Sequence, residues 1–305
     1  MHHFRSDVSR VAFPGLALAF ALFASCDSAP AALPPLDVAW APAAPVQGHL
    51  FVIGVAAPSG SGLISAVGEA GGEPLHFRRV GPVLESLAVV PISTVDTLDA
   101  WVRADYVDGR SRTDSLRLPV QAGEYEHERL TVAPRFGSPL NEEDQARLRS
   151  DREKAARAAR EAHAAPRMWS AVRLPRDSRV TSGFGTGREF NGQITSRHMG
   201  LDLAGARGAT VTAAADGVVA VVDGFLLGGN VVYLNHGGGL QTGYFHLSES
   251  LVSVGDTVTA GTPIGRVGAT GRVTGPHLHW VVRYGSTSVD PLSLLALPGI
   301  RSIPE

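Results

Sequence analysis

The sequence predicts an all-β protein, in which a small β-sandwich-like domain is followed by a charged connecting helix and a glycine-rich antiparallel β-sheet domain. Short apolar or alternating runs recur between turn residues, and 35 glycines accompany only 7% aromatic residues among 305 positions. A hydrophobic share of 44% is enough to build a core, and the length suits two domains with connectors. The formal net charge of −2 gives no sign of a surface that binds nucleic acid.

The N-terminus has the features of an export signal. Arg5 and Arg10 precede or flank an apolar run, Val11 to Ala24, that is too short to span a bilayer but suits the central region of a secretory signal. The run ends at Cys26, the single cysteine, in a pattern that resembles a bacterial lipobox, although Phe23 stands where Leu is usual. We therefore expect Cys26 to be lipidated and to anchor the exported protein to a membrane of the cell envelope, facing the periplasm. A plain secretory signal with an incidental cysteine is the alternative.

Changes in composition divide the chain into five segments. A Pro- and Ala-rich stretch without apolar periodicity predicts an extended tether, and strand-like runs follow it. The charged stretch from Asn141 to His163 lacks Gly and Pro and predicts a helix, which we expect to be an exposed connector because its apolar stripe is thin. The segments are a signal peptide (1–25), the lipidated cysteine and tether (26–46), the β-sandwich-like domain (47–135), the helical linker (136–165) and the glycine-rich domain (166–305).

One hairpin in the last segment is predicted in more detail. Val211 to Val222 is rich in Val and Ala and is interrupted by Asp216-Gly217. Because Asp-Gly is a favoured pair for tight turns between antiparallel strands, we expect the chain to reverse at that dipeptide.

The glycine-rich segment also holds side chains with metal-binding chemistry. His198 and Asp202 are four residues apart around Gly200, whereas His277 and His279 alternate along a predicted strand and so project to one face. Neutral imidazole and carboxylate groups are the ligands of a catalytic zinc that keeps one position open for water. Spacing alone leaves open the alternative that these histidines are core or surface groups.

The residues around these histidines form a longer series of motifs. The series comprises Ser182-Gly183-Phe184-Gly185, His198-Met199-Gly200-Leu201-Asp202, Asn235-His236-Gly237, Tyr244-Phe245-His246-Leu247 and Gly271-Arg272-Val273-Thr274-Gly275-Pro276-His277-Leu278-His279. In this order the motifs resemble those of the lysostaphin/LytM-type zinc endopeptidases, and the likeness covers about residues 169–295. The 166–305 segment is accordingly expected to be a zinc endopeptidase domain.

The resemblance implies a role for each matching position. His198, Asp202 and His279 match the three zinc ligands of the family, and His246 and His277 match its two catalytic histidines. His236 also matches a frequent position of the family and is interpreted as structural. The expected cofactor is therefore Zn²⁺, with no further cofactor-binding residues.

The expected function is hydrolysis of peptide bonds in peptidoglycan stem or cross-bridge peptides by metal-activated water, in a groove whose glycine-rich floor lets an extended peptide approach closely. The alternative is a non-catalytic envelope protein of the same fold that binds peptidoglycan or activates another cell-wall hydrolase. Cleavage of glycine-rich proteins is a second alternative. Expected partners are peptidoglycan peptides, the membrane through the lipid anchor and a regulatory envelope protein, but no nucleic acid.

Overall fold

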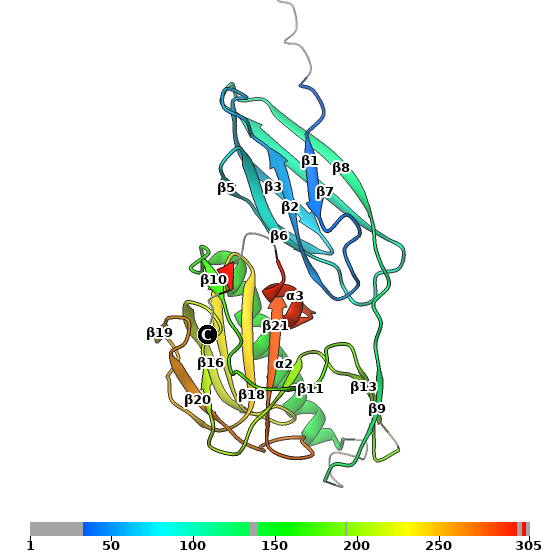
Figure 1. The fold of residues 1–305 in the computed structure, drawn as a ribbon, viewed down its shortest axis with the longest axis vertical. Helices are drawn as coiled ribbons and strands as arrows, with labels where there is room; N and C mark the ends of the chain where they lie inside the picture. The colour runs from blue at the N-terminus through cyan, green and yellow to red at the C-terminus, as the bar shows by residue number, and fades with distance from the viewer. Residues whose placement is uncertain (1–32, 134–139, 193, 298–300, 303–305) are drawn as a thin grey trace, which may run out of the picture. The chain divides into compact units, whose positions relative to one another are not determined.

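The alternating runs in the first half of the chain form two antiparallel sheets with a shared core (Figure 1). The computed structural model describes residues 33–133, 140–192, 194–297 and 301–302, so the predicted signal and Cys26 lie outside the described residues. The first sheet has the order β1 (Val38–Ala41), β2 (Leu50–Ala56), β6 (Val83–Val89) and β5 (Arg78–Val80). The second has the order β4 (Glu73–His76), β3 (Leu63–Ala70), β7 (Thr97–Tyr106) and β8 (Ser111–Pro119). The predicted sandwich is confirmed.

The sandwich begins upstream of its expected boundary. Strand β1 lies within the segment expected to be a tether, and its register pairs Val38 with Val55 of β2. Val38 and Trp40 are two residues apart and pack against the sandwich core, so they share a face of the strand. Backbone pairing and this apolar contact explain why the end of the expected tether is ordered as a strand.

The second half of the chain is built on one large, mainly antiparallel sheet. Its main path is β11 (Val180–Ser182), β14 (Leu201–Ala204), β21 (His277–Tyr284), β18 (Leu240–Ser250), β17 (Gly229–Gly237), β16 (Gly217–Phe225) and β19 (Thr257–Val258). Strands β15 (Thr210–Thr212), β20 (Pro263–Val267) and β22 (Thr287–Val289) pair beside it. The short helix α3 (Pro291–Leu295) follows, and β10 (Ala171–Val172) pairs with β23 (Arg301–Ser302). These strands confirm the predicted all-β class.

The predicted hairpin at Asp216-Gly217 is not formed. Strand β15 pairs with β20, and β16 pairs with β17 and β19, so the dipeptide joins strands that do not pair with each other. Gly217 does not have the positive φ that a tight Asp-Gly turn requires. A Cβ at Gly217 would lie 2.6 Å from the carbonyl oxygen of Asn235, so this glycine allows a close approach of two backbone segments.

The charged helix is α2 (Glu142–Ala164), and its Asn141 N-cap accepts a hydrogen bond from the Asp144 N–H. The helix itself was predicted correctly, but it is more than an exposed connector. Alanines on one side of it are buried, and Ala155 packs with aromatic residues of the large sheet. The buried Asp151 carboxylate accepts a hydrogen bond of 2.7 Å from the Leu226 N–H. Small side chains let the helix lie close to the sheet, which a hydrophobicity pattern does not reveal. No helix in the described part of the chain is long and apolar enough to cross a membrane.

A short strand that follows the sandwich in the sequence pairs with strands from the second half of the chain. Strand β9 (His127–Leu130) pairs in parallel with β12 (Gly187–Phe190), which also pairs with β13 (Ile194–Arg197). The expected sandwich domain, 47–135, therefore includes a strand, β9, that belongs to another sheet (Figure 1). Residues Leu50, Leu87 and Val89 of the sandwich also contribute to the core of the large sheet.

The buried Glu73 carboxylate links the sandwich to the large-sheet domain through partly buried hydrogen bonds. It is 5% exposed, and one of its carboxylate oxygens accepts hydrogen bonds from the Ser286 N–H (2.8 Å), the Ser286 hydroxyl (2.6 Å) and the Thr287 hydroxyl (3.0 Å). The other oxygen lies 3.0 Å from Nε2 of His163 on α2. The Glu73 carboxylate of the sandwich therefore has hydrogen-bond partners both on helix α2 and beside strand β22 of the large sheet.

Replacing Glu73 with alanine is expected to lower the free energy of unfolding by about 2 kcal/mol, because Ser286, Thr287 and His163 lose the carboxylate that accepts their hydrogen bonds. The measurement is urea unfolding monitored by circular dichroism. Glu69→Ala is the matched control, since Glu69 is exposed on β3 and its loss should cost less than about 0.5 kcal/mol. Equal stability of the two variants would contradict this role of Glu73.

Candidate metal centre and groove

Strand alternation places two of the predicted metal ligands on the same face of the large sheet. On β14, Leu201 and Leu203 are fully buried in the core, so Asp202 between them points to the opposite face. On β21, Leu278 and Trp280 are fully buried in that same core, and His279 between them points away from it. The register pairs Asp202 directly with His279, so the carboxylate and the imidazole are cross-strand neighbours.

His198 reaches this pair from the loop that precedes β14. Gly200 makes the approach feasible, because a Cβ at this position would lie 2.6 Å from His279 Cε1 and 2.6 Å from the Trp280 carbonyl oxygen. The glycine in the predicted His-Met-Gly-Leu-Asp motif is thus required by packing.

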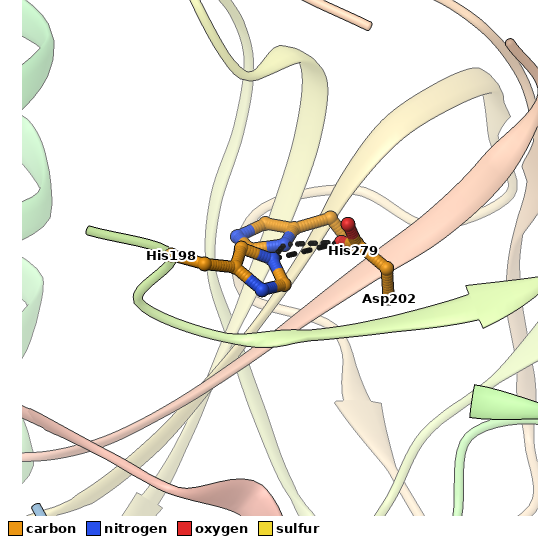
Figure 2. Close-up of side chains that lie close together, drawn as sticks. All are labelled: His198, Asp202 and His279. Carbon is orange, nitrogen blue, oxygen red and sulfur yellow. Dashed lines mark hydrogen bonds and ion pairs between the residues drawn. The ribbon is translucent and has the colours of Figure 1, made fainter. Parts of the chain in front are cut away.

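Atoms of the three candidate ligands converge at the face of the sheet. His198 Nε2 lies 3.0 Å from Asp202 Oδ1 and 2.8 Å from His279 Nδ1, and the latter two atoms are 2.8 Å apart. Figure 2 shows the three side chains pointing toward one another. The fold thus brings together His198, Asp202 and His279, the three residues that match the zinc ligands of the family.

The protonation pattern of the cluster fits a divalent cation. His198 Nδ1 lies 2.7 Å from the Gly183 carbonyl oxygen, to which it can only donate, so neutral His198 presents a lone pair at Nε2. Burial lowers the pKa of His279 to about 4, although the neighbouring Asp202 carboxylate opposes this shift. Burial also acts to raise the pKa of Asp202, but the close side chains of His198 and His279 hold that pKa well below its ordinary value. Two neutral imidazoles and one carboxylate are a donor set that suits zinc and leaves a fourth tetrahedral position.

His246 and His277 lie beside this cluster. Their ring centroids are 5.0 Å apart, and His277 Nε2 lies 3.6 Å from Asp202 Oδ1. In each ring Nδ1 donates to a backbone carbonyl oxygen, that of Thr270 for His246 and that of Gly275 for His277, both at 2.8 Å. In the neutral rings, Nε2 therefore carries the lone pair. Such a nitrogen can accept a proton from water or a substrate.

His246 has a strained backbone conformation, which changes the direction of its side chain. Its φ is +61°, which is unusual for a residue other than glycine, and it lies where the register between β17 and β18 shifts. A bulge of this kind redirects a side chain, and strained backbone of this type costs on the order of 1–3 kcal/mol. Burial lowers the pKa of His246 well below its ordinary value, and the nearby His279 and His277 lower it further. His246 is therefore neutral at neutral pH.

His236 takes no part in this cluster. It is fully buried, its Nδ1 donates to the Asp216 carbonyl oxygen at 2.8 Å and its Nε2 lies 2.7 Å from the Thr242 hydroxyl. Burial lowers its pKa to about 4. Both ring nitrogens have protein partners, as a structural histidine requires.

Arg188 is a site residue that the sequence analysis did not single out. Its Nη2 donates to Asp202 Oδ2 at 2.6 Å and to the Ser182 hydroxyl at 2.8 Å, while its Nε lies 3.3 Å from Oε2 of Glu128 on β9. Arg188 thus holds the carboxylate oxygen that faces away from the two imidazoles. Its position depends on the pairing of β9, β12 and β13, which no local spacing in the sequence indicates.

Replacing Arg188 with glutamine is expected to weaken Zn²⁺ binding by roughly tenfold to 100-fold, because the Asp202 carboxylate loses the partner that orients it. Competition with a fluorescent chelator measures this affinity. Arg179→Gln is the matched control, since the exposed Arg179 lines the same groove and has no ion pair among the described residues. Unchanged Zn²⁺ affinity in the Arg188 variant would rule out this orienting role.

A groove of about 400 Å³ lies beside the cluster. Asp202, His246 and His277 line it, together with Glu128, Leu130 and Val132 from the segment that contains β9. The expected glycine-rich floor is not observed. The lining of the groove includes only two glycines, Gly205 and Gly275, but three arginines, Arg179, Arg188 and Arg272. Many glycines elsewhere adopt positive φ in turns, which explains their abundance without placing them in the groove.

Comparison with known proteins places the cluster in a family. Residues 196–291 match the model of peptidase family M23. The chain is 43% identical over 135 residues to the peptidoglycan DD-endopeptidase ShyC of Vibrio cholerae serotype O1, an alignment that covers 43% of this chain and 31% of that protein. It is 35% identical over 127 residues to the murein hydrolase activator NlpD of Salmonella dublin, covering 41% of this chain and 32% of that protein. The chain thus spans about a third of the length of these curated relatives.

A solved structure extends the likeness beyond the metal centre. A crystal structure from Pseudomonas aeruginosa assigned to peptidase M23 superposes with a TM-score of 0.63 and 26% identity, covering 82% of this chain and 95% of that one. The likeness therefore reaches beyond the residues that the family model matches. With the matched residues 196–291 containing the whole cluster of histidines and Asp202, the chain carries a peptidase domain of family M23, the LytM/lysostaphin type.

Proposed function

We propose that this protein is a zinc endopeptidase that hydrolyses peptide bonds in peptidoglycan stem or cross-bridge peptides. The observation that carries the proposal is the convergence of His198, Asp202 and His279 within 4.8 Å of one another, with His246 and His277 beside them. The similarity to a peptidoglycan DD-endopeptidase supports this substrate class. The chemistry that zinc supplies when bound at such a site is acidification of a water molecule and polarisation of a peptide carbonyl.

The two flanking histidines can manage the protons of this reaction. Because each donates through Nδ1 to a backbone carbonyl, each keeps Nε2 for a water molecule or for the substrate. One neutral imidazole can accept a proton from the attacking water, and an imidazolium can donate a proton to the leaving amine or a hydrogen bond to the developing oxyanion. The geometry is compatible with either assignment of the two histidines to these steps.

The proposal is tested with purified sacculi. The zinc-loaded protein is expected to release soluble muropeptides, to lose this activity in a chelator and to regain it when Zn²⁺ is restored. Mass spectrometry of the products identifies the bond that is cut, with D-alanyl–diaminopimelate cross-links as the expected class. Absence of release by the zinc-loaded protein, with intact binding to sacculi, would favour the alternative.

That alternative is a protein that binds peptidoglycan or activates a separate hydrolase. The similarity to the murein hydrolase activator NlpD favours it. The presence of all three ligands and both flanking histidines favours catalysis, because a purely activating role requires none of them. Adding a purified cell-wall amidase to the sacculus assay separates the two functions.

We also propose that the protein is exported and anchored through lipidated Cys26, which would hold the peptidase domain beside the cell wall. The support is the apolar run that ends at this cysteine. Mass spectrometry of the mature N-terminus tests the proposal, and an unmodified Cys26 in the mature protein would contradict it.

A further inference from the structure

Arg272 occupies a position that the proposed reaction does not yet use. It lies between β20 and β21 and lines both the 400 Å³ groove and a smaller cavity of about 200 Å³. The residues common to both cavities are Arg188, Phe190, His246 and Arg272. Arg272 therefore borders both cavities, as His246 does.

Among the residues that the structure describes, no group of opposite charge forms an ion pair with Arg272. Its guanidinium carbon lies 4.1 Å from the centre of the Phe190 ring, but no carboxylate within the described ranges forms an ion pair with it. Arg188, in contrast, is paired with both Glu128 and Asp202. Burial lowers the pKa of Arg272, and the positive charge of Arg188 lowers it further. A partly buried cation in this state is stabilised by any anion that enters the groove.

The loop that carries Arg272 is held in place by hydrogen bonds. The Arg272 N–H donates to the Leu227 carbonyl oxygen at 2.9 Å. Two residues earlier, the Thr270 hydroxyl donates to the Leu247 carbonyl oxygen at 2.9 Å and accepts from the Asn230 N–H at 2.9 Å. The Thr270 carbonyl oxygen is the acceptor for His246 Nδ1. The same loop thus orients His246 and presents the unpaired guanidinium.

We propose that Arg272 binds a carboxylate of the substrate peptide near the bond that is cut, and so selects peptides that carry a negative charge at that place. This inference rests on the proposed function and adds a specificity determinant to it. The planar guanidinium can hold a carboxylate through two parallel hydrogen bonds, and its carbon lies over the Phe190 ring. Peptidoglycan peptides offer two sources of this group, a side-chain carboxylate within the stem and the carboxylate at the end of the peptide.

Two pairs of cross-linked muropeptides distinguish these sources. In the first pair, one peptide has a free side-chain carboxylate in the stem and the other has a carboxamide at that position. In the second pair, the peptides differ in the same way at the terminal carboxylate. For one of the pairs, kcat/KM of the zinc-loaded protein is expected to be about 10- to 100-fold higher with the free carboxylate. The pair that shows the preference identifies the group that Arg272 binds.

The Arg272→Gln variant is expected to reduce that preference to nearly one while it still hydrolyses the carboxamide substrate. Arg272→Lys should keep part of the preference, because it retains the charge but not the planar donor pair. Arg207→Gln is the matched control, since Arg207 is exposed and outside both cavities, and it should keep the full preference.

Equilibrium binding of the same four peptides, measured by calorimetry, gives a readout that does not depend on hydrolysis. If the protein cleaves none of them, the proposed function fails, and the binding preference then decides on Arg272 separately. Equal binding and cleavage of free and amidated peptides by the unmodified protein, or an unchanged preference in Arg272→Gln, would overturn the inference.

Discussion

Replacing His279 with alanine is expected to abolish both zinc binding and the release of muropeptides. The variant keeps only His198 and Asp202 of the three candidate ligands, and a structural or catalytic zinc needs at least three protein ligands. Because a bound metal supplies several kcal/mol of transition-state stabilisation, hydrolysis should fall by at least about 1,000-fold. Metal analysis after dialysis measures the zinc content, and chromatography of digested sacculi measures the rate.

His127→Ala is the matched control for this experiment. His127 is an exposed histidine on β9, and its ring forms no hydrogen bond or ion pair with the described residues. This variant should retain about one zinc per chain. A His279→Ala protein with full zinc content and full activity would refute both the metal site and the proposed reaction.

Replacing His246 with asparagine is expected to leave zinc bound but to lower kcat by a factor of about 10²–10⁴, the usual contribution of a positioned general acid or base. Asparagine tolerates the positive φ of this position better than alanine does, so the backbone strain is not the variable under test. His277→Asn should have an effect of similar size, since both rings face the same cluster.

Zinc content and thermal melting must accompany these rates. A loss of activity with full zinc and an unchanged melting temperature assigns the effect to proton transfer or transition-state stabilisation. Retention of the full kcat in both asparagine variants would exclude the two histidines from the chemistry, although the metal site could still be intact.

Local patterns in the sequence were enough to predict the strand-rich class and helix α2, whereas the candidate site residues were named through the resemblance to a family. Period-two alternation placed His277 and His279 on one face, and the order of the motifs pointed to His198, Asp202 and His246. The prediction of a hairpin at Asp216-Gly217 was wrong. An Asp-Gly pair can occupy a tight turn, but its glycine can also allow two backbone segments to approach closely, as Gly217 does here. Which of the two occurs depends on Asn235, a residue of another strand.

Other features depend on contacts between segments that are distant in the sequence. Arg188 orients Asp202 from a strand that pairs with β9, and Glu128 on β9 comes from the end of the expected sandwich domain. Arg272 lies within a motif that was noted for its histidine, yet its unpaired charge appears only when the surrounding carboxylates are located.

The residue types, their short spacings and the order of the motifs thus indicate which side chains are candidate metal ligands, because ligand atoms and strand periodicity are local properties. The folded arrangement determines which charges are paired, which groups line the groove and which tautomers the histidines adopt. These properties arise from strand register and burial, and both depend on residues that are tens to hundreds of positions apart.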